Sequence, residues 1–500
     1  MKHHDQPTKH NLGRAVKKGV LWTLTGRGVL TVADIAFTIL LARLLEPEQF
    51  GTFGTAMIFI GLANRFGNVG FVLALLQRKE IREEHISSVF VANLVIFSLI
   101  AGSFIWASPL IGRFFNNPLA GQVAAIGSIV FFTHAFSSIA RVRLQRQMNF
   151  KIPAIAAVVD HLAGSLITVG FAWAGHGVWS LLYGHVLGSA ISAALLVFCS
   201  GWLPRLRYSH AAMKDIYAFG LGVFLKNLVI YGSDSIDYLI IGKQLGPTAL
   251  GLYEKAFRIM DTGTKEISEK IGAGVFFSAF SRLQDDTTRL RAAYSKVVMT
   301  LSLISFPAFF GLFLVAPSFV YVLFGEKWLP SVIPLQILCI AGLLRVHLNL
   351  TSGVITALGK VAVEVVMRCL AFVLLTTGCL IGSFWGITGV TVAVTITTAI
   401  LTVVIVSYFC RLTELSWKDF LLPQLSALWA SLFMFAIVTM YQRWSQPALG
   451  TYSVPMLMSS TAVGVISYIT GLLILRPPAV VSLFRELTAD VKLVFQRTAQ

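Results

Sequence analysis

The chain has 500 residues, of which 56% are hydrophobic and only 13% are charged, and its mean hydropathy is +0.76. A soluble core of this size cannot bury so much apolar surface, so the composition excludes a soluble globular protein and predicts an integral membrane protein. The net charge of +17 follows from where the basic residues stand relative to the membrane, and a nucleic-acid partner is not needed to explain it.

The polar N-terminus is too long for a secretory signal peptide, and no small-residue cleavage site follows the first apolar segment, so we expect this segment to remain as a membrane span. Windows of about 20 residues predict an all-α protein with fourteen transmembrane helices. In chain order they cover residues 18–42, 51–76, 86–112, 119–140, 152–174, 177–202, 215–242, 249–281, 292–324, 332–358, 361–384, 386–410, 420–441 and 453–475.

The loops between these helices carry very unequal numbers of basic residues. With the N-terminus in the cytoplasm, the cytoplasmic segments hold 25 of the 40 lysines and arginines, and the outward loops hold 5. Cytoplasmic loops of membrane proteins are enriched in these residues. The asymmetry therefore supports the helix count and predicts that both termini are cytoplasmic.

The sequence partly repeats itself at an offset of 200 residues. "ILLARLLEPEQFGTFGTA" at 39–56 resembles "LIIGKQLGPTALGLYEKA" at 239–256, with a proline and a glycine at matching places in both. Six predicted helices separate the two copies, and an even number preserves orientation, so we expect parallel repeats. The predicted domains are an N-terminal lobe at 1–202, a C-terminal lobe at 203–412, and two further helices with a cytoplasmic tail at 413–500. The alternative is that any tight turn between spans favours proline and glycine.

The sequence offers little that an enzyme would need. The outward loops are too short for the catalytic domain expected of a membrane polymerase or ligase, and no nucleotide-binding G-x-x-x-x-G-K-[ST] loop, H-E-x-x-H or G-x-S-x-G motif occurs. The five cysteines lie in apolar spans without metal-ligand spacing, so they are interpreted as small buried hydrophobic residues. We therefore expect neither an enzyme nor a bound cofactor or metal.

Ionisable residues inside the predicted spans are the main candidates for function, because burying them is costly. In 249–281, five charged residues follow at steps of four, three, four and four, which places them on one face of a helix. Such a face must line water or pack against other charges, and a ladder of ion pairs within the helix is the structural alternative. The residues are Glu254, Arg258, Asp261, Lys265 and Glu269.

Basic residues elsewhere suit an anionic substrate, because arginine and lysine can replace lost hydration with a phosphate. The expected cationic binding residues are Arg27, Arg65, Lys226, Arg258, Lys265 and Arg345. Residues expected to serve gating or ion coupling are Asp34, Asp234, Asp237, Glu254 and Asp261. Salt bridges that lock the helices together are the alternative for these charges. Asp160 and His161 could form either a proton relay or an interhelical hydrogen bond.

Three stretches resemble a known family: 39–80, 236–259 ("IDYLIIGKQLGPTALGLYEKAFRI") and 276–296 ("FFSAFSRLQDDTTRLRAAYSK"). They are similar to the polysaccharide transporter branch of the multidrug/oligosaccharidyl-lipid/polysaccharide flippase superfamily, and most of all to Wzx-type exporters of the colanic acid and teichuronic acid kind. The resemblance implies two six-helix lobes around a cationic cavity. It also implies a bacterial cytoplasmic membrane protein that moves an undecaprenyl-diphosphate-linked oligosaccharide from the inner to the outer leaflet by alternating access.

Partners implied by the resemblance are membrane lipid and a polysaccharide polymerase with its co-polymerase. Two other classes stay open at this stage. One is an ion-coupled drug or metabolite antiporter of the multidrug and toxin extrusion type, and the other is a non-transporting scaffold of a glycan assembly complex. The 10 basic residues inside spans, against 10 acidic ones, weakly oppose an antiporter for cationic substrates.

Overall fold

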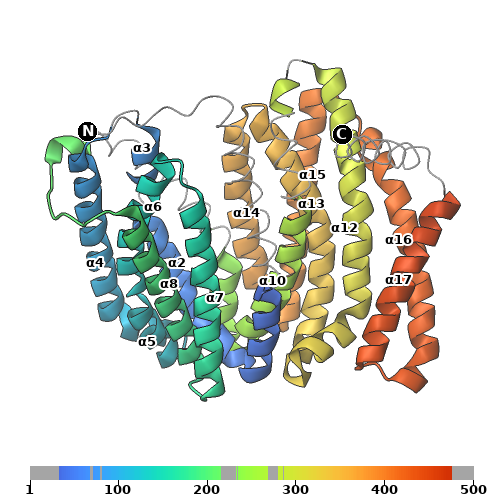
Figure 1. Ribbon diagram of the computed structural model, residues 1–500. Coiled ribbons are helices and arrows are strands. Elements are labelled where there is room, and N and C mark those ends of the chain that lie inside the picture. Colours follow the sequence, from blue (N-terminus) through green and yellow to red (C-terminus); the bar gives the residue numbers. More distant parts are fainter. Residues whose placement is uncertain are drawn as a thin grey trace, which may run out of the picture. The chain divides into compact units, whose positions relative to one another are not determined.

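The structure is a computed structural model that describes residues 33–67, 71–78, 81–214, 232, 235–268, 280–284 and 286–475. Throughout this part of the chain the regular elements are helices, and no β-strand occurs in it (Figure 1). Within the same residues, nine helical segments are long and apolar enough to cross a membrane. One of them, Val361–Thr413, covers two predicted spans. The chain is therefore an all-α, multi-pass membrane protein.

Two compact units divide the chain, Met1–Gly251 and Leu252–Gln500. The first contains helices over residues 33–44 and 235–244. Its other helices are α2 (Pro47–Gly67), α3 (Phe71–Gln77), α4 (Glu83–Phe114), α5 (Pro118–Gly127), α6 (Val130–Arg146), α7 (Lys151–Trp173) and α8 (Val178–Ser200).

One buried apolar cluster of the first unit lies where α2, α4, α5 and α8 meet. Ala56, Phe115 and Leu182 are almost fully buried there, beside the buried valine and alanine of α5. Asn117 begins α5 because its side chain accepts a hydrogen bond from the Ala120 amide, with Pro118 in the first helical position. The predicted span at 119–140 is thus two helices in succession, α5 and α6.

The two copies of the sequence repeat touch each other inside the first unit. α2 begins at Pro47, and α10 (Gly246–Ile267) begins one residue before Pro247. A Cβ atom added to Gly51 would collide with the Pro247 carbonyl oxygen, and one added to Gly251 would collide with the Pro47 carbonyl oxygen. The first turns of the two helices therefore pack backbone to backbone in a reciprocal way, and only glycine permits this approach.

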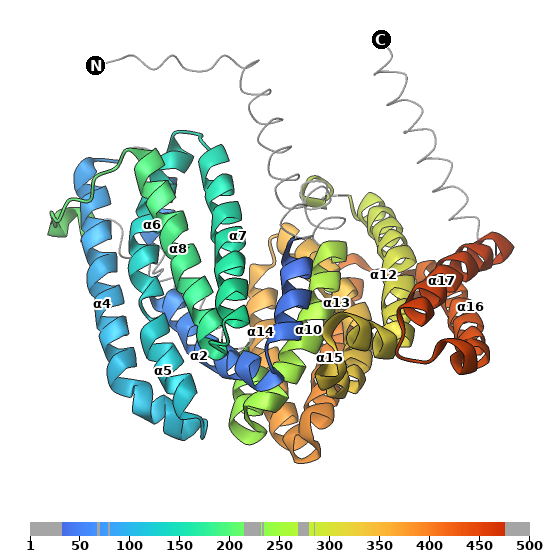
Figure 2. The same cartoon turned by 60° about the horizontal axis from the view of Figure 1, so that its bottom comes forward.

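The second unit contains the remainder of α10 and the C-terminal helices. These are α12 (Thr287–Phe324), η2 (Glu326–Ser331), α13 (Val332–Ala357), α14 (Val361–Gly382), η3 (Ser383–Trp385), α15 (Gly386–Thr413), α16 (Trp417–Leu449) and α17 (Val454–Leu475). Figure 2 shows α16 and α17 as a pair beside α12. Two side chains tie this pair to the backbone of α12: Gln442 donates to the Leu314 carbonyl at 3.3 Å, and Tyr468 donates to the Leu303 carbonyl at 2.8 Å.

The membrane orientation predicted from the charges gives a direct expectation. Cysteine at position 46, in the turn before α2, should react with an impermeant thiol reagent added outside intact cells. Cysteine at position 147, in the exposed turn after α6, should react only after the membrane is permeabilised. The opposite pattern at both positions would invert the topology, and equal protection at both would contradict the helix count.

Candidate functional site

The charged stripe predicted on residues 249–281 lies on α10. The helix continues to Ile267, so Glu254, Arg258, Asp261 and Lys265 share one face. Glu269 lies outside the described residues. The stripe is uneven in exposure, since the side chains of Arg258 and Lys265 are exposed whereas Asp261 is only partly so.

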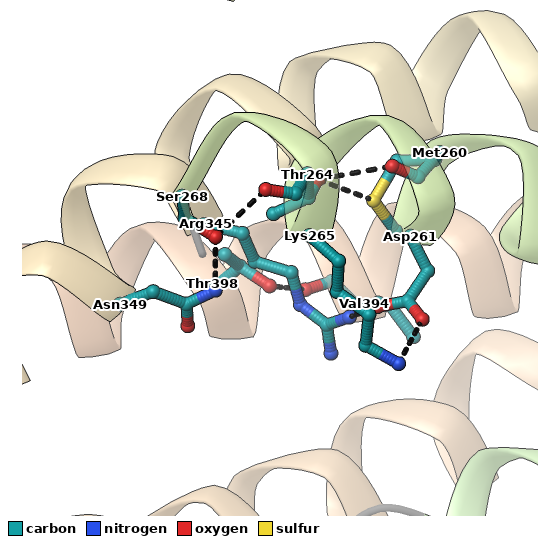
Figure 3. A network of polar contacts seen from close by, with 9 residues as sticks. All are labelled: Met260, Asp261, Thr264, Lys265, Ser268, Arg345, Asn349, Val394 and Thr398. Atoms are coloured by element: carbon teal, nitrogen blue, oxygen red, sulfur yellow. Dashed lines mark hydrogen bonds and ion pairs between the residues drawn. The ribbon is translucent and has the colours of Figure 1, made fainter. Parts of the chain in front are cut away.

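Asp261 is contacted by two cations (Figure 3). Its carboxylate lies 2.7 Å from the Lys265 Nζ, one helical turn further along α10. On its other side it lies 3.5 Å from a guanidinium nitrogen of Arg345, which comes from α13. The structural alternative, an ion pair within the helix, is thus present for Asp261 and Lys265. The same carboxylate also joins α10 to a second helix.

Neighbouring side chains hold this arrangement in place. The Arg345 guanidinium lies over the Phe257 ring at 5.0 Å from its centre, which restricts its position by a cation–π contact. One turn beyond Lys265, Asn349 of α13 donates to the Ser268 hydroxyl at 3.5 Å. Ser268 in turn donates to the Thr264 carbonyl at 2.7 Å. Polar contacts between α10 and α13 therefore extend over about two helical turns.

The charges at this point do not balance. One carboxylate faces one ammonium and one guanidinium group, so Asp261, Lys265 and Arg345 together carry a formal net charge of +1. The side chain of Lys265 is 59% exposed and that of Arg345 is 26% exposed, so both can be reached from outside the protein. A planar guanidinium beside an ammonium is well suited to bind a phosphate or carboxylate group. We call these three residues the α10–α13 cation site.

Further towards the start of α10, Glu254 has a different environment. Its Oε2 atom is buried and has no hydrogen-bond partner among the described residues. Arg258 and Lys255 are close enough to interact with it electrostatically. Lys255 is 5% exposed, and its Nζ lies 5.1 Å from the centre of the Trp328 ring. This lysine holds α10 against η2, a packing role that the stripe pattern did not predict.

In the first unit, Asp34 lies close to a histidine of another helix. The His161 Nε2 lies 3.7 Å from the Asp34 carboxylate, and both side chains are about one-third exposed. This pair joins the helix at 33–44 to α7. His161 therefore faces a different aspartate from the neighbouring one that the sequence suggested, although Asp160 does interact electrostatically with His161 and with His185 of α8.

The remaining predicted residues divide into two groups. Asp237 lies on the helix at 235–244, is 4% exposed and belongs to the first unit. Arg27, Lys226 and Asp234 lie outside the described residues, and so does the side chain of Arg65, although its position falls on α2. The proposed cationic role of Arg27, Arg65 and Lys226 therefore stays a prediction.

Sequence reasoning missed the residues that orient the cation site. Phe257 is one of many aromatic residues in an apolar span, and Asn349 is an uncharged amide, so neither had a pattern to mark it. The charge stripe on α10 could have drawn attention to Phe257. This residue directly precedes Arg258 and stands three positions after Glu254, which is close to it on the helix surface. Its contact with Arg345 depends on tertiary packing.

A sequence profile described as "Polysaccharide biosynthesis protein" matches residues 40–333, which is more than half of the chain. The chain belongs to this polysaccharide biosynthesis protein family. Membership agrees with the resemblance found in the three sequence stretches, and it covers the repeat turns, the whole of α10 and the polar face of that helix.

Curated relatives are bacterial proteins of cell-surface glycan synthesis. The chain is 26% identical over 427 residues to "Lipopolysaccharide biosynthesis protein WzxC" of Escherichia coli K12, covering 83% of this chain and 84% of that protein. It is 25% identical over 360 residues to "Teichuronic acid biosynthesis protein TuaB" of Bacillus subtilis, covering 70% and 73%.

Solved structures show which fold this family member adopts. The lipid II flippase MurJ in an inward closed conformation aligns with a TM-score of 0.75 at 15% identity, covering 94% of this chain and 100% of that one. An inward-facing multidrug resistance MATE transporter aligns with a TM-score of 0.58 at 19% identity, covering 77% and 94%. The chain thus has the fold of these transporters, and this likeness by itself does not specify a substrate.

Proposed function

We propose that this protein is a flippase that moves a lipid-linked oligosaccharide, carried on undecaprenyl diphosphate, across the bacterial cytoplasmic membrane for surface polysaccharide synthesis. Family membership and relatives named for lipopolysaccharide and teichuronic acid biosynthesis support the pathway. The observation that carries the proposal is the α10–α13 cation site, with two cations on one carboxylate inside a membrane helix bundle.

A diphosphate attached to a polar glycan cannot cross about 30 Å of hydrocarbon unaided, because its charges would lose their hydration. Arg345 and Lys265 can replace part of that hydration with charge-assisted hydrogen bonds. Asp261 holds the two cations in place when no anion is bound. The lipid tail needs no such site, since it can remain in the bilayer throughout.

After the substrate is released, the protein must return to its starting conformation. Acidic residues can contribute to this return. The Asp34–His161 contact joins two helices of the first unit and is a place where a change in charge could alter their packing. We assign Asp34 and Asp237 in the first unit, with Asp234, Glu254 and Asp261, to gating or ion coupling. We further propose that both termini lie in the cytoplasm. A polysaccharide polymerase with its co-polymerase would then use the product.

Deletion of the gene in its native host should cause lipid-linked repeat units to accumulate on the cytoplasmic side and surface polymer to disappear. Arg345→Gln should fail to restore export, with a loss of about tenfold to a hundredfold, because a charged hydrogen bond to the diphosphate contributes roughly 1.5–3 kcal/mol. Arg345→Lys should retain part of the activity. Lipid extracts analysed by mass spectrometry and immunoblots of membranes give the two measurements.

The matched control is Arg411→Gln, which removes an exposed basic residue at the end of α15 and should leave export unchanged. Failure of the deletion to accumulate lipid-linked units would overturn the flippase function itself. Normal accumulation in the deletion strain combined with full export by Arg345→Gln would instead place the diphosphate elsewhere, for example at Arg27, Arg65 or Lys226.

A further inference from the structure

The segment that follows α8 is fixed to the protein at both ends. In the sequence "GWLPRLRYS" at 201–209, the Trp202 side chain is 2% exposed, and its ring meets that of Phe90 edge-on, with the ring centres 5.1 Å apart. At the other end, the Ser209 amide donates to the Ser88 hydroxyl at 2.9 Å. Both anchors lie on the first turns of α4, so the backbone between them is held beside that helix.

Between the anchors, large apolar side chains project away from the protein. Leu203 is 77% exposed, Leu206 is 76% exposed and Tyr208 is 55% exposed. Arg205 and Arg207 alternate with them and are exposed as well. Neither arginine makes a hydrogen bond or ion pair with the part of the chain that the structure describes. Such a short segment displays three apolar and two cationic side chains that the described part of the chain does not cover, which is unfavourable in water.

The position of this segment indicates what receives it. Figures 1 and 2 both show the green chain after α8 passing α4 to the rim of the first unit. It lies at the end where α4 begins and α8 ends, which the charge distribution places on the cytoplasmic side. Phe198, in the last turn of α8, is 87% exposed and marks the adjoining lipid-facing surface. The segment therefore stands where the hydrocarbon surface of the helices meets the aqueous phase.

We propose that residues 203–208 form a binding site for anionic phospholipid headgroups of the inner leaflet. Leu203 and Leu206 enter the boundary between headgroups and acyl chains, and Tyr208 occupies the interfacial zone that suits an aromatic ring with a polar end. Arg205 and Arg207 bind lipid phosphates, which are negatively charged and lie at the depth that these side chains reach. This proposal depends on the predicted orientation and is independent of the flippase function.

The apolar side chains of this segment, more than its arginines, favour a lipid surface as the ligand. Basic residues alone are expected in any cytoplasmic loop, so the arginines by themselves would indicate only topology. The exposed leucines and the tyrosine distinguish a segment that enters the interface from one that stays in solution. An acidic protein would satisfy the arginines, but the continuity of the segment with the lipid-facing surface favours the bilayer.

The test uses the full-length protein in lipid nanodiscs, with the five native cysteines replaced. A bimane probe on Leu206→Cys should show blue-shifted emission in phosphatidylglycerol and should be quenched by lipids that carry a shallow nitroxide. The same probe on Gln147→Cys, in an exposed turn predicted to lie on the same side, should resemble the probe in water. Addition of Arg205→Gln and Arg207→Gln should return the probe at 206 towards the aqueous spectrum.

Native mass spectrometry gives a second readout without any probe. The protein with Arg205→Gln and Arg207→Gln should retain phosphatidylglycerol with an affinity roughly tenfold to thirtyfold lower at one site, given the usual strength of an arginine at an anionic surface. Arg411→Gln with Lys418→Gln removes the same charge from exposed positions in the second unit and should change that site little. A water-like spectrum at 206 in anionic nanodiscs would overturn the proposal. Shielding at 206 only in native membranes would also overturn it and would point to a docked protein.

Discussion

Gly51→Ala should unfold at a clearly lower temperature than the wild type and should lose export. A Cβ at this position would lie closer than 3.0 Å to the Pro247 carbonyl oxygen and carbon and to the Gly251 amide nitrogen. These are backbone atoms at helix starts, so they cannot turn aside as a flexible side chain can. Overpacking of this kind typically costs about 1–3 kcal/mol. Thermal unfolding of the purified protein, followed by fluorescence-detected chromatography, measures the effect.

The reciprocal change Gly251→Ala should behave in the same way, because its Cβ meets the Pro47 carbonyl. Gly102→Ala in α4 and Gly170→Ala in α7 are matched controls, since a Cβ at either position has no neighbour within 4 Å. Alanine is the better helix former, so these controls should be neutral or slightly stabilising. If Gly51→Ala melted with the controls and exported normally, the close contact between the two turns would not exist in the protein.

Asp261→Asn should bind undecaprenyl diphosphate about tenfold more tightly than the wild type and should export more slowly. In the wild type the carboxylate competes with any anion for Lys265 and Arg345. The amide is similar in shape but carries no charge, so both cations become available, and one lost competing interaction at a partly exposed site corresponds to roughly 1 kcal/mol or a little more. Slow export follows, because no internal anion helps to displace the substrate.

Binding in nanodiscs, followed by native mass spectrometry, separates this expectation from a purely structural role. A structural ion pair predicts a lower unfolding temperature for Asp261→Asn with diphosphate affinity unchanged. The control is Glu326→Gln in η2, which neutralises an exposed carboxylate of the same unit and should alter neither quantity. Weaker binding by Asp261→Asn would contradict the proposed competition.

Much of the fold could be predicted from local properties of the chain. Apolar runs of membrane-spanning length determine all-α structure, because only internally hydrogen-bonded helices or closed barrels satisfy the backbone in lipid. The charges on α10 fall on one face because helical geometry is regular, and the structure confirms that helix up to Ile267. The repeat at 39–56 and 239–256 was also visible, because close backbone packing limits the residue choice to glycine.

The pairing of charges could not be predicted in the same way. Arg345 is 84 positions from Asp261. Acidic residues on other helices, such as Asp160 on α7, were equally possible partners for it in the sequence. The contact depends on how α13 is rotated about its axis, and many apolar contacts set that rotation. Likewise, His161 stands beside Asp160 in sequence but faces Asp34 across a helix interface.

The sequence alone therefore determined the class of protein, the number of predicted spans, the polar face of α10 and the family resemblance. Each depends on residue type and on periodicities that a helix imposes locally. The tertiary structure decided that Asp261 serves two cations and that Phe257 orients one of them. It also placed exposed leucines of 203–208 at the rim of the first unit. These features arise from contacts between segments that are distant in sequence. Which residues meet is decided by the packing of whole helices, and no local pattern specifies it.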